Sequence, residues 1–352
     1  MRDVCIVTGG AGFIGCAISA LLMERFRRVV AVDNLHPQIH PQRIRPAALH
    51  PGVTLIESDV TRASDWESLL INYKPECVIH LAAETGVGQS LTEASRHAAV
   101  NVSGLAVMLD ALARANALPA RIILTSSRAV YGEGAYRGAG GAVVYPGQRT
   151  REQFVAGHWD FKGVEPIPAC ASLTGPAPVS VYGATKLAQE HVISAWTNAF
   201  GVETAILRLQ NVYGVGQSLR NPYTGVVQLF CQIAREKKSI PLYEDGQMLR
   251  DFILIDDVAE AIIRAVDVER APEGALDVGT GVPTSIARLA EAIAARYGAP
   301  PPHVSGKYRY GDVRHAACRI DATTEQLDWR PRRDLDTGLK DLCDWIETER
   351  VS

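Results

Sequence analysis

The stretch "TGGAGFIG" (residues 8–15) decides the fold, because it joins an apolar run to a helical one through a glycine-rich turn. Gly10, Gly12 and Gly15 satisfy the pattern G-x-G-x-x-G, and Gly9, Gly12 and Gly15 fit the variant G-x-x-G-x-x-G. Such a turn brings the backbone close to a pyrophosphate and points a helix N-terminus at its negative charge. Taken alone the glycines are weak evidence, since an ordinary strand–helix turn can carry them.

Acidic residues farther along the chain strengthen this interpretation. Asp33 lies 18 residues beyond Gly15, where a carboxylate can bind the adenosine ribose hydroxyls of a dinucleotide. It would repel a 2′-phosphate, so the sequence favours NAD over NADP. Asp59 and Val60 are expected to flank the adenine.

Six short apolar runs alternate with helical stretches. These predict an α/β fold, with a doubly wound parallel Rossmann sheet and ligands at the carboxyl ends of the strands. The runs are residues 4–10, 28–34, 53–59, 77–83, 121–127 and 203–209.

Composition excludes several classes of protein. The 352 residues carry 36 basic and 39 acidic side chains and a net charge of −3, which argues against nucleic-acid and anionic-membrane partners. The seven cysteines never form C-x-x-C, which predicts reduced thiols and no metal site. With neither a signal segment nor an apolar run of membrane-spanning length in the sequence, we expect a soluble, cytoplasmic protein.

The stretch "SVYGATK" (residues 180–186) carries the candidate chemistry. Tyr182 and Lys186 are four residues apart, so a helix places them on one face, where the ammonium would favour the phenolate. Tyr182 could then accept a proton from a substrate hydroxyl while a hydride passes to NAD. Ser127 supplies a hydroxyl that can share that proton, whereas Thr125 and Ser126 more simply cap the strand end.

At this point the sequence resembles the extended short-chain dehydrogenases/reductases, in the NAD-dependent sugar-nucleotide epimerase/dehydratase group. The resemblance covers essentially the whole chain and rests on specific motifs. They are "TGGAGFIG", "HLAAETGVGQS" (80–90), "SSRAVYG" (126–132), "YGATK" (182–186), "LRLQNVYG" (207–214), "EDGQMLRDFILIDDVAEA" (244–261), "LDVGTG" (276–281) and "YGDVRH" (310–315).

The resemblance implies three sets of site residues. Ser127, Tyr182 and Lys186 match the family's catalytic triad. The implied cofactor contacts are Gly9, Gly12, Phe13, Ile14, Gly15, Asp33, Asn34, Asp59, Val60, Leu81, Ala82, Ala83, Asn101, Tyr182 and Lys186. The implied substrate contacts are Thr85, Ser127, Arg128, Asn211, Arg250 and Arg314, the last two as arginines that clamp the nucleotide diphosphate.

The pair Arg128-Ala129 narrows the expected reaction. The family's 4,6-dehydratases carry Asp-Glu at these positions, and neither residue found here can protonate a leaving hydroxyl or abstract a C5 proton. The best interpretation is oxidation of C4 to a 4-ketose and return of the hydride to the opposite face. A nucleotide 4-ketosugar reductase and a non-catalytic NAD-sensing or scaffold protein remain as alternatives.

The segment between Ser127 and Tyr182 is about twice as long as a simple epimerase of this family needs. The extra residues, 133–178, are rich in Gly and Pro, and form either a tolerated surface loop or a lid over the sugar pocket. Their start resembles the subgroup that inverts C4 of dTDP-L-rhamnose to give dTDP-6-deoxy-L-talose, with UDP- and GDP-sugars as alternatives. Some members carry cysteine pairs in this insert, whereas only Cys170 is present here, so no metal is predicted.

We therefore expect two domains. Residues 1–209 would form the NAD-binding Rossmann domain, with 252–280 returning to it, and residues 210–352 a smaller C-terminal α/β domain that binds the sugar nucleotide (dTDP- or UDP-linked). By analogy with relatives, the helices after Thr92 and Tyr182 would form the interface of a homodimer.

Overall fold

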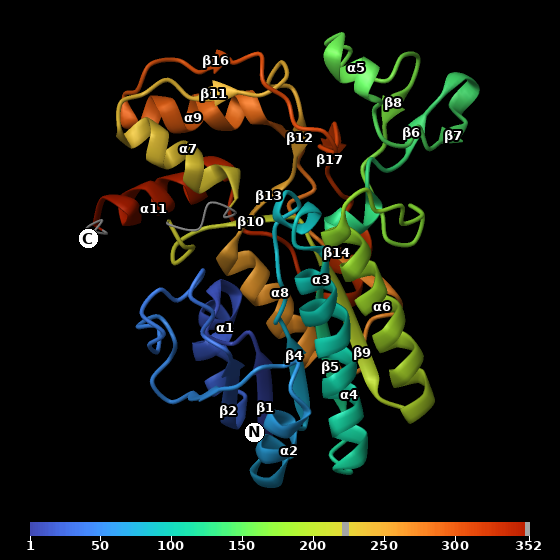
Figure 1. The fold of residues 1–352 in the computed structure, drawn as a ribbon, viewed down its shortest axis with the longest axis vertical. Helices are drawn as coiled ribbons and strands as arrows, with labels where there is room; N and C mark the ends of the chain where they lie inside the picture. Colours follow the sequence, from blue (N-terminus) through green and yellow to red (C-terminus); the bar gives the residue numbers. More distant parts are fainter. Residues whose placement is uncertain (220–224, 349–352) are drawn as a thin grey trace.

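The structure is a computed structural model that describes residues 1–219 and 225–348. Within them, seven parallel strands form one sheet in the order β14-β9-β5-β4-β1-β2-β3, which confirms the predicted doubly wound sheet (Figure 1). Six of these strands overlap the six predicted runs, and β14 adds a seventh. The strands are β1 (Arg2–Thr8), β2 (Phe26–Asp33), β3 (Thr54–Glu57), β4 (Cys77–His80), β5 (Arg121–Ser127), β9 (Glu203–Leu209) and β14 (Ala275–Val278).

The strand order reverses between β1 and β4. From β1 the chain winds outward through β2 and β3, and from β4 it winds the other way through β5, β9 and β14. In such sheets the crevice outside the carboxyl ends at the reversal is where ligands bind. The fold therefore directs attention to the ends of β1, β4 and β5.

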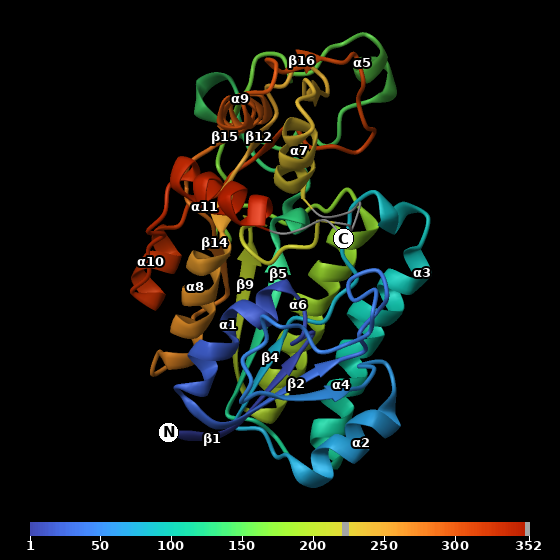
Figure 2. The ribbon, with the colours of Figure 1, turned by 90° about the vertical axis from the view of Figure 1, so that its left-hand side faces the viewer.

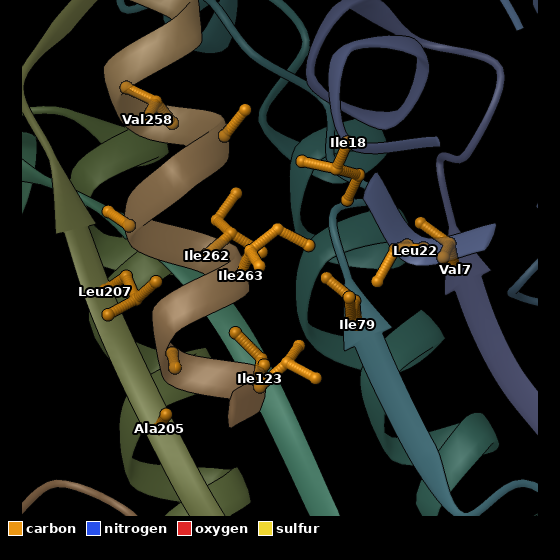
Figure 3. Close-up of a cluster of buried hydrophobic side chains, with 14 of the residues drawn as sticks. Val7, Ile18, Leu22, Ile79, Ile123, Ala205, Leu207, Val258, Ile262 and Ile263 are labelled. Carbon is orange, nitrogen blue, oxygen red and sulfur yellow. The ribbon is translucent and has the colours of Figure 1, made fainter. Parts of the chain in front are cut away.

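Alternating side chains of the strands face two helical layers. Cys5 and Val7 face α1 (Phe13–Met23) and α8 (Ile255–Asp267), and Figure 3 shows Ile262 and Ile263 of α8 lying among Ile79, Ile123 and Leu207 of the sheet. Val4 and Ile6 face the opposite layer, which is formed by α2 (Ala63–Asn72), α4 (Gly104–Arg114) and α6 (Val181–Phe200).

The helix before β5 is interrupted by a π-helical turn. It begins as α3 (Ala94–His97), continues as the π-helix η2 (Ala98–Ser103) and ends as α4. Turns of this kind are common at functional sites. Here the turn carries Asn101, one of the residues predicted to bind the cofactor.

A smaller unit with its own core lies beyond the carboxyl edge of the sheet (Figure 2). Its helices α7 (Val226–Arg235), α9 (Ile286–Tyr297) and α11 (Leu335–Thr348) surround buried residues such as Phe230, Leu289 and Leu342. The remaining elements of the C-terminal part are short: β10 (Asn211–Tyr213), β11 (Pro241–Leu242), β12 (Leu249–Arg250), β13 (Phe252–Leu254), β15 (Thr284–Ser285), β16 (His303–Val304), β17 (His315–Ala316) and α10 (Asp321–Leu327).

Residues 133–178 form a separate small structure, called the insertion below (Figure 1). It holds a three-stranded antiparallel sheet of β6 (Tyr136–Arg137), β7 (Val143–Val144) and β8 (Glu165–Pro166), together with the one-turn helix α5 (Arg151–Val155). A parallel bridge between Ala169 and Cys318 ties it to the chain after β17. The insertion therefore has defined structure and a defined neighbour.

Among the described helices, none is long and apolar enough to cross a membrane.

Candidate active site

The glycine-rich turn joins β1 to α1 and leaves no room for side chains. Gly9 has a φ of +65°, and a Cβ there would lie 2.8 Å from the backbone nitrogen of Ala82. A Cβ on Gly15 would lie 2.5 Å from the carbonyl oxygen of Gly10. Both positions thus require glycine. The turn exposes the start of α1, where Gly12, Phe13 and Ile14 were predicted to meet the cofactor.

Asp33 stands at the end of β2 and faces this turn. Its Oδ2 accepts the backbone N–H of Ala11 at 3.1 Å, and its Oδ1 accepts that of Leu35 at 2.9 Å. The carboxylate is thereby fixed beside the pyrophosphate cradle, as ribose binding requires. This pairing of a cradle that a Cβ would fill with a fixed carboxylate fits NAD.

Asn34 and Asp59 lie together on the same side of the site. The Nδ2 of Asn34 donates to the Oδ2 of Asp59 at 3.5 Å. Burial raises the pKa of Asp59, but hydrogen bonds from Thr61 and Asn34 outweigh it, and the net direction is downward. Asp59 is therefore an anion, and Val60 beside it is buried.

The end of β4 forms the other side of the crevice. Leu81 donates its N–H to the carbonyl of Thr8 at 3.0 Å, so the segment from Leu81 to Ala83 runs beside the glycine turn. Asn101 reaches it from η2, accepting the N–H of Glu84 at 2.7 Å and donating to the Oγ1 of Thr185 at 2.9 Å. The predicted Thr85 lies next in this segment. Asn101 thus links the cofactor side of the crevice to α6.

The first two turns of α6 carry Tyr182 and Lys186. Ser180 caps this helix, since its Oγ accepts the N–H of Gly183 at 3.0 Å. Lys186 is buried and its Nζ donates to the carbonyl of Thr125 at 2.9 Å. Burial lowers the pKa of Lys186 to about 8, and nearby Glu190 opposes this shift.

Ser127 ends β5 beside Tyr182. Burial raises the pKa of the Tyr182 phenol, while the hydrogen bond with Ser127 and the positive charge of Arg128 lower it without overcoming burial. The sequence argument assigned this lowering to Lys186, whose ammonium is directed instead to the carbonyl of Thr125. In the structure, Arg128 is the cation whose charge lowers the pKa of the Tyr182 phenol.

Arg128 and Arg250 form a pair of neighbouring guanidinium groups, of which Arg250 is buried and Arg128 is half-buried. Removal from water lowers the pKa of Arg128 to about 9, and repulsion from Arg250 adds to the effect. Arg250 donates to the carbonyl of Val313 at 2.9 Å, and neither arginine forms an ion pair in the described residues. Two neighbouring cations without an ion-pair partner favour an anionic ligand.

Arg314, unlike Arg128 and Arg250, is surrounded by carboxylates. Its guanidinium donates to Asp160 at 2.7 Å, to Asp245 at 2.7 and 2.8 Å, and to Glu244 at 3.2 Å, and the residue is 2% exposed. A diphosphate at Arg314 would have to displace carboxylates. Asn211 is the first residue of β10. It pairs with Phe252 of β13, which lies two residues after Arg250.

Sequence reasoning missed the carboxylates behind the site. Glu190 accepts two hydrogen bonds from Arg208, at 3.0 and 2.7 Å, and a short one from the hydroxyl of Ser126. Its position four residues after Lys186 could have signalled this role.

In residues 1–219 and 225–348 no group of three His, Cys, Asp or Glu side chains could hold a metal ion.

Comparison with known proteins shows which family this chain resembles. Residues 5–279 match the family model described as "NAD dependent epimerase/dehydratase family". A dTDP-L-rhamnose 4-epimerase from Burkholderia thailandensis is 56% identical over 344 residues, which cover 98% of this chain and 95% of that protein.

Solved structures agree with this placement. A UDP-glucose 4-epimerase from Thermotoga maritima, solved with UDP-glucose, is 25% identical with a TM-score of 0.81, covering 98% of this chain and 99% of that one. A UDP-glucose 4-epimerase from Thermus thermophilus, solved with NAD, is 26% identical with a TM-score of 0.75 and the same coverage.

Proposed function

The chain belongs to the NAD dependent epimerase/dehydratase family, and from that premise we propose that it inverts C4 of a nucleotide-linked sugar, with dTDP-L-rhamnose as substrate and dTDP-6-deoxy-L-talose as product. NAD is the cofactor. The 56% identity over nearly the whole length of a dTDP-L-rhamnose 4-epimerase supports the choice of sugar.

One observation carries the reaction type. The hydroxyl of Ser127 lies beside the phenol of Tyr182 and lowers its pKa, and the residue that follows Ser127 is the cation Arg128 rather than a carboxylate. Oxidation of an alcohol needs a group that accepts one proton, which the phenol can do. Elimination of water would need a further acid and base. The site thus supports hydride and proton transfer at C4.

In the proposed mechanism Tyr182 accepts the proton of the C4 hydroxyl and later returns it to the C4 oxygen when the ketone is reduced. Ser127 shares that proton through its hydrogen bond to the phenol. When bound, NAD supplies a reversible hydride acceptor and a positive ring that favours the phenolate. Arg128 stabilises the same phenolate from the protein side, and Arg250 with Arg128 attracts the anionic diphosphate.

Incubation with dTDP-L-rhamnose in heavy water tests this proposal. We expect the C4 epimer to form without added reductant, with the C4 hydrogen retained and no deuterium at C5. Product stereochemistry and isotope positions are read by NMR.

Three results would contradict parts of the proposal. Deuterium at C5, or loss of water from dTDP-glucose, would show that another residue supplies an acid and a base. A requirement for NADPH would favour the reductase. Clean inversion of another nucleotide sugar would keep the mechanism and replace the substrate.

Two further properties belong to this proposal. We propose a homodimer built on α3, η2 and α6, whose outward faces carry exposed small residues such as Ala98, Ala184 and Ala195. We also propose a cytoplasmic location. It is supported by seven free cysteines, two of which, Cys231 and Cys343, remain thiols although their sulfurs are 3.9 Å apart.

A further inference from the structure

A small cavity lies between the ends of β5 and β9, the strand β17 and the insertion. Its volume is about 20 Å³, which is room for one water-sized group. Its polar lining residues are Arg128, Tyr131, Glu133, Gln210 and His315, and Ile167 and Ala169 of the insertion complete the lining.

Two side chains on this cavity carry polar atoms without partners. Gln210 is 5% exposed, yet neither its Nε2 nor its Oε1 has a hydrogen-bond partner. The Nδ1 of His315 is likewise buried and unpartnered. Buried polar atoms are normally satisfied, because leaving one without a partner is costly. A group that enters the cavity would supply the missing hydrogen bonds.

The backbone of both residues is held by hydrogen bonds. Gln210 donates its backbone N–H to the carbonyl of Val278 at 2.9 Å, and a Cβ on Gly279 would lie 2.6 Å from its Cγ. The backbone N–H of His315 donates to the carboxylate of Glu133 at 3.2 Å. Burial first, and then Arg314, lower the pKa of His315 to about 4, so the ring is neutral at neutral pH. A hydroxyl can pair with either tautomer of a neutral ring.

The cavity is adjacent to the proposed chemistry. Arg128 lines it, directly follows Ser127 and acts on the phenol of Tyr182. A Cβ on Gly183 would lie 2.5 Å from the carbonyl oxygen of Ala129, so the turn after β5 packs directly against the start of α6. The cavity therefore adjoins the site of Tyr182 through Arg128 and the turn after β5.

We propose that the amide of Gln210 and the ring of His315 bind one ring hydroxyl of the nucleotide sugar, at C2 or C3, in a cavity that the insertion restricts to a single such group. This specificity site rests on the proposed function, since it presupposes a sugar held for reaction at C4. The other occupant would be a structural water.

The first test changes the enzyme. Gln210→Leu keeps the approximate volume of the side chain and removes both orphan atoms. We expect kcat/KM for dTDP-L-rhamnose to fall about 10- to 100-fold, while the thermal unfolding midpoint stays equal or rises. The matched control is Thr204→Val, which removes the unpartnered buried Oγ1 of Thr204 at the other end of β9. It should leave kcat/KM unchanged.

The second test changes the substrate. Wild-type enzyme and Gln210→Leu are compared on dTDP-L-rhamnose and on its 2-deoxy and 3-deoxy analogues. Wild-type enzyme should discriminate strongly against one analogue only, and Gln210→Leu should treat that analogue and the parent sugar alike.

The outcomes separate the two proposals. Unchanged kcat/KM in Gln210→Leu, or a loss that is equal for all three sugars, would overturn the hydroxyl site and leave a water or a structural role. If wild-type enzyme does not invert dTDP-L-rhamnose but inverts another nucleotide sugar, the substrate proposal fails. The same comparison on deoxy analogues of that sugar then decides the role of Gln210.

Discussion

Tyr182 is the residue on which the proposed chemistry depends most. Tyr182→Phe keeps the ring and removes the oxygen that accepts the C4 proton in the proposed mechanism. We expect kcat to fall by about 10²–10⁴-fold, the range that general acid–base catalysis contributes, with little change in the Kd of the nucleotide sugar. Steady-state kinetics and calorimetry measure the two quantities. An active variant would require a different base.

Arg128 gives a prediction about pH. Tyr182 must lose its proton to act as a base, so activity falls at pH values below its pKa. The charge of Arg128 lowers that pKa, and Arg128→Met should therefore raise it. We expect the acid limb of the kcat/KM profile to move upward by roughly one pH unit.

The charged and titratable neighbours of Arg128 set the controls. They are Arg250, Asp312, Glu133 and Tyr182, so other substitutions there would mix several effects. Arg128→Lys keeps the charge and should restore most of the wild-type profile. An equal loss of activity at all pH values in Arg128→Met would mean that the residue only binds substrate.

Asp33 decides between the two dinucleotides. Denatured wild-type protein should release NAD(H), and Asp33→Ala should retain less of it while gaining tolerance for a 2′-phosphate. Chromatography of the released nucleotide, with binding of NAD and NADP to the stripped protein, measures both. Release of NADP(H) alone from the wild-type protein would refute the argument from Asp33.

At the scale of elements, a buried ion pair joins the insertion to the C-terminal part of the chain. Arg149 and Glu244 have fully buried side chains and are joined by two hydrogen bonds, at 2.7 and 2.9 Å. Arg149→Met would leave Glu244 charged and only partly paired. We expect a loss of about 3 kcal/mol in unfolding free energy, measured by chemical denaturation.

A matched arginine in the same insertion is the control. Arg151 lies over the ring of Tyr310 at 4.9 Å but is exposed, so Arg151→Met should cost less than about 1 kcal/mol. Combining Arg149→Met with Glu244→Leu should recover much of the loss, because no buried charge then remains unpaired. An equal loss in both single variants would show that the ion pair is not what fixes the insertion.

These elements also show what sequence can and cannot predict. The strands of the sheet follow from local apolar runs, and the glycine turn follows from local spacing. The partner of Arg149 lies 95 residues away, and that of Arg314 in the insertion lies 154 residues away. No local pattern encodes such pairs. For the same reason Arg314 was predicted from its motif, while the three carboxylates around it were not.

At the scale of the molecule, the candidate site forms where three parts of the chain meet. The sheet contributes Asp33 and Ser127 from its carboxyl edge, the C-terminal part contributes Arg250, and the insertion closes the cavity beside Gln210. Spacing and residue type predicted Asp33 and Ser127, and the resemblance predicted Arg250. Whether the insertion covers the sugar pocket is decided by contacts that only the folded chain reveals.

The last prediction concerns association. Ala195 is exposed on α6, within the face proposed for the homodimer, and Ala295 is exposed on α9 of the smaller unit. Arginine and alanine have similar helix propensities, so neither substitution should unfold its helix. Wild-type protein and Ala295→Arg should show twice the chain mass of 38.1 kDa by light scattering, whereas Ala195→Arg should show the mass of a single chain. A long charged side chain in the centre of a close helix–helix contact would prevent the two copies from meeting. If Ala195→Arg remained dimeric, the contact would lie elsewhere, and a monomeric wild-type protein would refute the dimer itself.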